Sequence, residues 1–261
     1  MAEDIGPGDI TSRLTVPAEA KARAVLVARS PGTLCGIAVA GRVFRTLDSN
    51  IRFLPELADG ASYTRGAVLA RIAGPARSVL GAERTALNFI QRLSGIATHT
   101  ARFVAAVQGT DCRVLDTRKT LPGWRMLEKY AVRCGGGTNH RFGLYDMVLV
   151  KDNHIAAAGS ITAALERCRT KLEVEVECGT LADVREALLS GAKRILLDNM
   201  SVAQLRRCVK LVNGRAVLEA SGGVNLKTVA AIARTGVDYV SVGAITHSAP
   251  AADIALDFLP G

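Results

Sequence analysis

From residue 113 onward, short apolar stretches alternate with longer stretches of helical periodicity. The apolar stretches, which we predict to be strands, are residues 113–115, 147–150, 174–176, 195–197, 217–219 and 239–242. The stretches between them, such as residues 181–189 and 202–212, repeat apolar positions at helical spacing. Short buried strands that alternate with helices are typical of βαβ units in a parallel sheet.

The number of these units leaves two architectures open. Six units are fewer than the eight of a standard (β/α)₈ barrel. A doubly wound sheet is the structural alternative.

The first hundred residues have a different pattern. We predict strands at residues 24–28, 51–54 and 68–72 and a helix at residues 36–47, which together form an α+β layer. Residues 78–107 then predict one long helix that links the two regions.

Composition narrows the function classes. The chain has 261 residues, 49% of them hydrophobic but only 4% aromatic, so Ala, Val, Leu and Ile must form the core. The net charge of +9 is compatible with an acidic small substrate, a nucleic acid or a membrane surface. Scarce aromatics and the lack of a long Lys/Arg block argue against a nucleic-acid partner.

The six cysteines contain no CxxC pair, which favours free thiols in a reducing compartment over a zinc site. The chain shows neither a signal peptide nor an apolar run of membrane-spanning length. We therefore expect a cytoplasmic protein without a membrane partner.

Polar and small residues recur where the predicted strands end. Glu177, Asp198, Ser221 and Gly243 follow successive strands at intervals of about 22 residues, so all four would emerge at the carboxyl edge of the sheet, where α/β proteins place their chemistry. Small residues at 221–223 and 242–244 let backbone N–H groups approach an anion. Each loop alone could be a tight turn, but together they favour a phosphate site.

Residues 116–154 are the densest feature of the sequence. Arg118 and Lys119 follow one strand, Arg141 follows a triple glycine and His140, and Lys151 ends the next strand. Any one of these could be an ordinary surface cation. Together they would repel one another unless anions bind between them, so the sequence predicts a polyanion site.

The carboxylates in this region have two interpretations. Glu175, Glu177 and Asp198 could hold Mg²⁺ or ribose hydroxyls inside a cationic site. We expect Glu175 to be paired or ligand-bound in the sheet interior, and Glu177 to lie nearer the rim. The alternative is that they form ion pairs with Lys119 or Lys151.

The motifs themselves resemble a known family. The segments that carry the resemblance are EDIGPGDITS from Glu3, ERTALNFIQRLSGIA from Glu83, the whole of residues 116–154, VEVEC from Val174, ILLDNM from Ile195, EASGGV from Glu219 and residues 235–248. They span nearly the full chain, and the chain resembles the quinolinate phosphoribosyltransferases. In that family a helical segment precedes the first motif, which here begins at residue 3, so the family's N-terminal dimer contacts need not all be present.

The resemblance implies a two-domain fold, an N-terminal α/β sandwich followed by an open seven-stranded α/β barrel. The sandwich would comprise residues 1–97, joined by a C-terminal helix at 251–261, and the barrel residues 98–250. The implied reaction joins quinolinate to phosphoribosyl pyrophosphate with Mg²⁺, and yields nicotinate mononucleotide, pyrophosphate and CO₂. The implied assembly is a homodimer with shared active sites.

The resemblance also assigns roles to residues. Arg84 would reach the site of the neighbouring subunit, and Glu175 and Asp198 would face the ribose and the metal. The residues that would surround the quinolinate carboxylates are Arg118, His140, Arg141 and Lys151, with Thr117 and Lys119 nearby. The 5′-phosphate would be held by Ser221, Gly222, Gly223, Val242, Gly243 and Ala244. The residues implied to be catalytic are Lys119, Lys151, Glu175 and Asp198.

Two other functions remain open. One is a pyrophosphorylase-like paralogue from molybdenum operons, with another substrate, although the intact HR and KDNH segments here argue against it. The other is a non-catalytic anion-binding module. The carboxylates argue against that, because they would weaken simple anion binding.

Overall fold

A computed structural model describes residues 1–168 and 170–260 and divides them into two compact units. The first unit contains residues 1–101, 126–136 and those from Ala249 onward, and the second contains residues 102–125 and 137–248. The boundary falls within the long helix α4 (Ala76–Ala106). No helix among the described residues combines the length and the hydropathy of a membrane span.

The first unit is an α/β sandwich. Its antiparallel sheet has the order β12-β1-β5-β3 and is formed by β1 (Lys21–Ala28), β3 (Arg52–Pro55), β5 (Val68–Pro75) and β12 (Ile254–Phe258). Buried side chains of α3 (Ile37–Leu47) and of the first half of α4 form one core with this sheet. The smaller elements are α1 (Ala2–Ile5), α2 (Ile10–Thr15), β2 (Gly32–Thr33) and β4 (Ser62–Tyr63).

The C-terminal segment corrects one prediction. We expected a helix at residues 251–261, but this region forms the strand β12, which pairs antiparallel with β1. Ile254, Leu256 and Phe258 are apolar at every second position, which is the strand period rather than the helix period. Pairing also satisfies the backbone groups along an otherwise open edge of β1.

The second unit is built on a six-stranded parallel sheet with the order β6-β11-β10-β9-β8-β7. Its strands are β6 (Arg113–Leu115), β7 (Val148–Val150), β8 (Val174–Cys178), β9 (Arg194–Asp198), β10 (Val217–Ser221) and β11 (Tyr239–Ser241). A single bridge from Leu115 to Thr138 extends the sheet beyond β6, where the family pattern predicts a seventh strand. The fold class, a sandwich plus an open α/β barrel, is confirmed.

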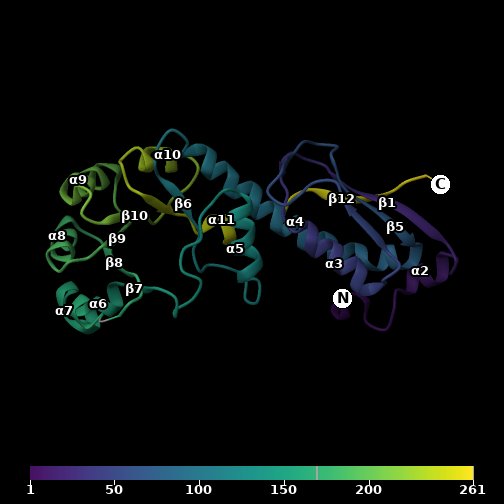
Figure 1. The fold of residues 1–261 in the computed structure, drawn as a ribbon, viewed down its shortest axis with the longest axis horizontal. Coiled ribbons are helices and arrows are strands. Elements are labelled where there is room, and N and C mark those ends of the chain that lie inside the picture. Colours follow the sequence, from purple (N-terminus) through teal and green to yellow (C-terminus); the bar gives the residue numbers. More distant parts are fainter. Residues whose placement is uncertain (169, 261) are drawn as a thin grey trace. The chain divides into compact units, whose positions relative to one another are not determined.

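Helices lie around the outside of this sheet (Figure 1). They are α6 (Asp152–Ala158), α7 (Ile161–Arg167), α8 (Leu181–Leu189), α9 (Val202–Val212), α10 (Val229–Ala233) and α11 (Ala244–His247). Side chains of Ser160, Thr180 and Ser201 cap the backbone at the starts of α7, α8 and α9.

Helix α5 (Arg125–Cys134) lies within the residues 98–250 that the prediction gave to the barrel. All but its first residue belongs to the first unit instead. The reason is a buried ion pair: Arg92 of α4 donates to the fully buried carboxylate of Glu128 at 2.8 Å. A buried charge needs such a partner, and this one holds α5 against α4.

Candidate active site

A cavity of about 650 Å³ opens at the carboxyl ends of the barrel strands. Strand pairing brings Leu196, Glu219 and Tyr239 into one row, and Asp198 beside Ser221. Because side chains alternate between the two faces of a strand, these residues share the face that looks into the cavity. The lining residues are Asp116, Thr117, Arg118, Lys119, His140, Arg141, Leu149, Lys151, Leu196, Asp198, Asn199, Glu219, Ser221, Gly222, Gly223, Val224, Ser241, Gly243, Ala244 and His247.

Most of the predicted site residues meet in this cavity. Arg84, Glu175 and Val242 are absent from its lining. Arg84 is an exposed residue on α4 of the first unit. Val242 is buried, because the alternation that turns Ser241 to the cavity turns Val242 away from it.

Glu175 is paired in the interior of the sheet. Its side chain is 0% exposed, and its two carboxylate oxygens lie near different partners. One accepts from Arg194 Nε at 2.9 Å, and the other lies 2.9 Å from His140 Nε2. The predicted contact of Glu175 with ribose and metal stays a prediction.

Glu177 is the carboxylate that meets a predicted cation. Lys151 Nζ donates to Glu177 at 2.7 Å, with the lysine nearly half exposed at the rim. This is the ion pair that the sequence left open as an alternative. It orients Lys151 at the end of β7.

Four cations line the cavity, and we call them the cationic wall: Arg118, Lys119, Arg141 and Lys151. Hydrogen bonds to backbone carbonyls hold the loops of this wall together. The Arg125 guanidinium donates to Thr120 and to the carbonyls of Arg118 and Phe142, so it ties together the loops that carry Arg118 and Arg141. Arg118 Nε is buried and has no hydrogen-bond partner within the described structure. A buried charged donor without a partner is costly, so an acceptor from outside the described residues would stabilise this side chain.

Burial and the nearby charge of Arg118 lower the pKa of Arg141. This shift means that the two guanidinium groups repel each other in the unliganded pocket. An anion bound between them would relieve that repulsion.

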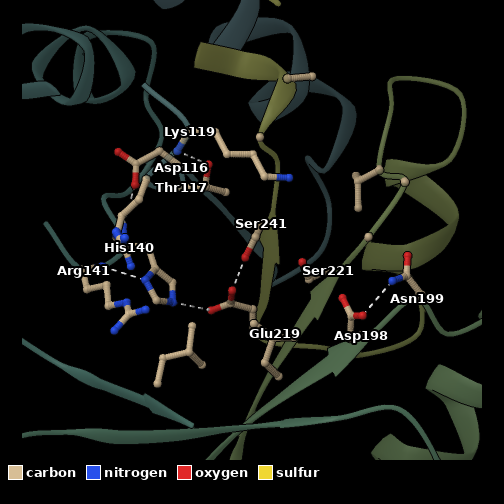
Figure 2. Close-up of a pocket in the computed structure, with 18 of the residues that line it drawn as sticks. Asp116, Thr117, Lys119, His140, Arg141, Asp198, Asn199, Glu219, Ser221 and Ser241 are labelled. Carbon is tan, nitrogen blue, oxygen red and sulfur yellow. Dashed lines mark hydrogen bonds and ion pairs between the residues drawn. The ribbon is translucent and has the colours of Figure 1, made fainter. Parts of the chain in front are cut away.

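His140 is the best-anchored residue of the cavity. Asp116, fully buried, accepts from the His140 backbone N–H at 2.8 Å and from Asn139 Nδ2 at 2.7 Å. Burial lowers the pKa of His140, but hydrogen bonds to Glu175 and Glu219 outweigh it and raise that pKa to about 9. Figure 2 shows Glu219 between His140 and Ser241.

The opposite side of the cavity is formed by glycine turns. Gly222 has φ +95°, and a Cβ atom there would lie 2.1 Å from Asn199 Oδ1, so only glycine fits. Asn199 also donates to Asp198 at 2.6 Å, which orients that carboxylate (Figure 2). The segment that follows Gly243 contacts the loop that carries Lys119, because the Thr246 hydroxyl donates to the Lys119 carbonyl at 2.8 Å.

The helix that follows the first of these turns is short. Residues 225–228 form a turn, with Asn225 N–H donating to Thr228, and α10 begins only at Val229. The residues that line this part of the cavity are therefore Gly222, Gly223 and Val224 of the turn rather than residues of α10.

Sequence reasoning missed several lining residues. Glu219 and Ser241 were interpreted only as strand residues, and no function was expected for His247, yet all three line the cavity. Strand alternation could have identified Glu219, since it stands two positions before Ser221 on the same face. Nothing in the sequence pattern distinguished Asn199 or His247.

Comparisons with known proteins agree with this geometry. Residues 9–94 match the model of the quinolinate phosphoribosyl transferase N-terminal domain, and residues 96–257 that of its C-terminal domain. The chain is 45% identical over 259 residues to the probable nicotinate-nucleotide pyrophosphorylase [carboxylating] of Bacillus subtilis, covering 98% of this chain and 89% of that protein. It is 42% identical to quinolinate phosphoribosyltransferase [decarboxylating] 1b of Nicotiana tabacum, covering 98% and 79%.

Solved structures agree as well. The nicotinate-nucleotide pyrophosphorylase of Francisella tularensis superimposes with a TM-score of 0.96 at 41% identity, covering 99% of this chain and 92% of that one. A nicotinate-nucleotide pyrophosphorylase from Pyrococcus furiosus, 19% identical with a TM-score of 0.73, shares the fold. The matches to both domain models and to full-length relatives place the chain in the quinolinate phosphoribosyl transferase family.

Proposed function

We propose that this chain transfers a phosphoribosyl group from phosphoribosyl pyrophosphate to quinolinate, with loss of CO₂, in the de novo synthesis of NAD. The observation that carries the proposal is a cavity lined by the four cations Arg118, Lys119, Arg141 and Lys151 together with Asp198 and the glycine turns. Family membership supplies the reaction, and the charge of the cavity suits both substrates, which are polyanions.

The cationic wall suits the quinolinate end. Quinolinate carries two adjacent carboxylates, and the planar fork of an arginine can bind a carboxylate through two parallel hydrogen bonds. Arg118 and Arg141 supply forks, while Lys151 and Lys119 supply point charges. Thr117 and His140 complete this side of the cavity.

The glycine turns suit the 5′-phosphate of the second substrate. Gly222, Gly223 and Gly243 line the cavity without side chains, and backbone of this kind can bind phosphate oxygens. Ser221 and Asp198 lie between the two ends of the cavity, where the ribose would be placed.

The chemistry follows from this placement. As the bond from ribose C1′ to pyrophosphate breaks, positive charge grows on the ribose, and the Asp198 carboxylate stabilises it. The quinolinate nitrogen attacks C1′, and the electrons of the broken bond leave with pyrophosphate, whose charge Lys119 and Lys151 offset. The ring nitrogen is then positively charged, so the adjacent C2–CO₂⁻ bond can break with its electron pair held at C2. CO₂ leaves, and C2 takes a proton.

Magnesium is part of the proposal. Mg²⁺ binds through one or two carboxylates together with substrate phosphates, and it neutralises the charge of the departing pyrophosphate when bound. Asp198 fits this role, because its carboxylate lines the cavity and is fixed by Asn199. Glu175 is paired with Arg194 and His140, and its contact with the metal stays a prediction.

Assembly and location complete the proposal. We infer a homodimer in the cytoplasm, in which Arg84 of one subunit reaches the cavity of the other. Its support is the exposure of Arg84 on α4.

Selective binding tests the proposed substrate. Calorimetry should detect quinolinate binding to the full chain, with nicotinate, which lacks the second carboxylate, bound on the order of 10-fold to 100-fold more weakly. Equal affinity for both would contradict the assignment of the cationic wall to a dicarboxylate. It would instead favour a paralogue with another substrate.

A further inference from the structure

Four ionisable side chains lie together at the floor of the cavity, and two of them, His140 and Glu219, also line it. The four are Glu175 on β8, Arg194 on β9, Glu219 on β10 and His140 in the loop after Thr138. The side chains are 0%, 11%, 1% and 7% exposed, respectively. Burying so many charges requires that each be paired, so their pairing geometry decides how the floor is built.

Arg194 lies at the centre of this cluster. Its Nε donates to Glu175 at 2.9 Å, and its Nη2 donates to Glu219 at 2.7 Å. The guanidinium also lies over the Tyr239 ring, 4.8 Å from its centroid. Strand register explains the placement, because Arg194 pairs across from Glu175 and points to the same face.

Both carboxylates also face His140: Glu175 through its second oxygen, and Glu219 through the same oxygen that accepts from Arg194. His140 Nε2 lies 2.9 Å from Glu175 and 3.4 Å from Glu219. In the neutral tautomer that carries its proton on Nε2, the ring accepts the backbone N–H of Arg141 at Nδ1, at 2.7 Å. The ring is therefore fixed at both nitrogens, and its orientation determines where the Arg141 backbone lies.

A metal ion could in principle gather the same three groups, since their ligand atoms lie within 4.8 Å of one another. Here the guanidinium already takes the place of a cation, with directional bonds to both carboxylates. Its charge offsets two carboxylates that would otherwise repel each other and compete for the single His140 ring. A neutral side chain at 194 would leave that repulsion, and one carboxylate would have to turn away or take up a proton.

We propose that Arg194 is a positioning residue for His140: by holding the two buried carboxylates from below, it fixes the imidazole and, through Nδ1, the backbone of Arg141. Arg194 itself is absent from the cavity lining. Its effect on catalysis rests on the proposed assignment of His140 and Arg141 to quinolinate.

The experiment compares three variants of the full chain with the wild type. Arg194→Gln removes the charge, and Arg194→Lys keeps the charge but loses the fork. Arg113→Gln is the matched control, because Arg113 opens strand β6 of the same sheet and is exposed. Proton and ¹⁵N NMR follow the Nε2–H of His140. The chain has only four histidines, and His140→Gln assigns the signal.

We expect a slowly exchanging Nε2–H signal in the wild type and in Arg113→Gln, its loss in Arg194→Gln, and a smaller shift in Arg194→Lys. The KM for quinolinate should rise on the order of 10-fold to 100-fold in Arg194→Gln, as for a displaced substrate-positioning group. The KM for phosphoribosyl pyrophosphate should change less than about threefold. Arg194→Lys should recover part of the loss.

An unchanged His140 signal in Arg194→Gln would overturn the proposal. If that variant does not fold, an unshifted signal in Arg194→Lys overturns it instead. A lost signal with an unchanged KM for quinolinate has a separate meaning: the positioning role of Arg194 stands, and the assignment of His140 and Arg141 to quinolinate fails.

Discussion

At the scale of single residues, the environment of each cation decides what it can do. Lys151 is paired with Glu177 at the rim of the cavity. The Arg125 guanidinium donates its hydrogen bonds to protein groups of two loops. Arg118 differs, because its buried Nε has no acceptor within the described structure. This contrast makes Arg118 the residue whose replacement should affect binding most selectively.

Replacing Arg118 with Lys should weaken quinolinate binding on the order of 10-fold to 100-fold. The charge stays, but the fork that can bind a carboxylate in two places is lost, and charged hydrogen bonds contribute about 1.5–3 kcal/mol each. Calorimetric titration measures the effect. Arg206→Lys, on the exposed side of α9, is the control and should bind as the wild type does. Equal affinity in Arg118→Lys would reject the role.

The cysteines are predicted to differ sharply in reactivity. A hydrogen bond from the Cys35 thiol lowers the pKa of Cys134 to about 7, although burial opposes this. Burial raises the pKa of both Cys112 and Cys178 to about 12. Since the thiolate is the nucleophile, iodoacetamide at neutral pH should alkylate Cys134 well before Cys112 or Cys178.

Peptide mass spectrometry over time measures the order of alkylation. Cys35→Ala is the informative variant: without the hydrogen bond, alkylation of Cys134 should slow. Labelling of Cys134 no faster than that of the buried cysteines would count against the predicted thiolate.

At the scale of elements, the long helix α4 offers a case in which packing opposes intrinsic propensity. Alanine normally stabilises a helix relative to glycine by about 1 kcal/mol. At Gly95 a Cβ atom would lie 2.1 Å from the carbonyl oxygen of Pro250, and backbone atoms cannot easily move aside. At Gly81 the nearest atom is the flexible end of Leu47 at 3.2 Å.

Gly95→Ala should therefore lower the free energy of unfolding by about 1–3 kcal/mol, the usual cost of overpacking. Gly81→Ala, on the same helix, should be neutral or slightly stabilising. Urea denaturation of both variants provides the comparison. A stabilised Gly95→Ala would show that the C-terminal segment does not approach α4 as described.

The elements also show what sequence could and could not predict. The barrel strands were predictable, because each is a short apolar run between helical periods. β12 was missed although its alternating apolar residues have the strand period, and its pairing with β1, more than two hundred residues away, is not visible locally. Glu175 was placed correctly in the interior, but the sequence could not reveal that Arg194, one strand further, would bind it.

At the scale of the whole molecule, the proposed dimer makes each active site depend on two chains. Arg84 and Lys151 would then belong to complementary halves of one site. The consequence can be tested without a structure of the dimer.

Inactive Arg84→Ala and inactive Lys151→Ala, once mixed and allowed to exchange subunits, should regain about a quarter of wild-type activity. In a symmetric dimer half of the pairs become hybrids, and each hybrid has one intact site. Steady-state assays before and after exchange measure the gain. No recovery, with exchange verified by native mass spectrometry of tagged subunits, would contradict a shared site.

The central claim is that the cavity joins quinolinate to a phosphoribosyl group and releases the C2 carboxylate. The most direct measurement uses quinolinate labelled at that carboxylate, with phosphoribosyl pyrophosphate, Mg²⁺ and the full chain. We predict release of labelled CO₂ in a 1:1 ratio with nicotinate mononucleotide, and none without phosphoribosyl pyrophosphate. Folded protein that forms no nicotinate mononucleotide, or CO₂ release that does not require phosphoribosyl pyrophosphate, would contradict the account.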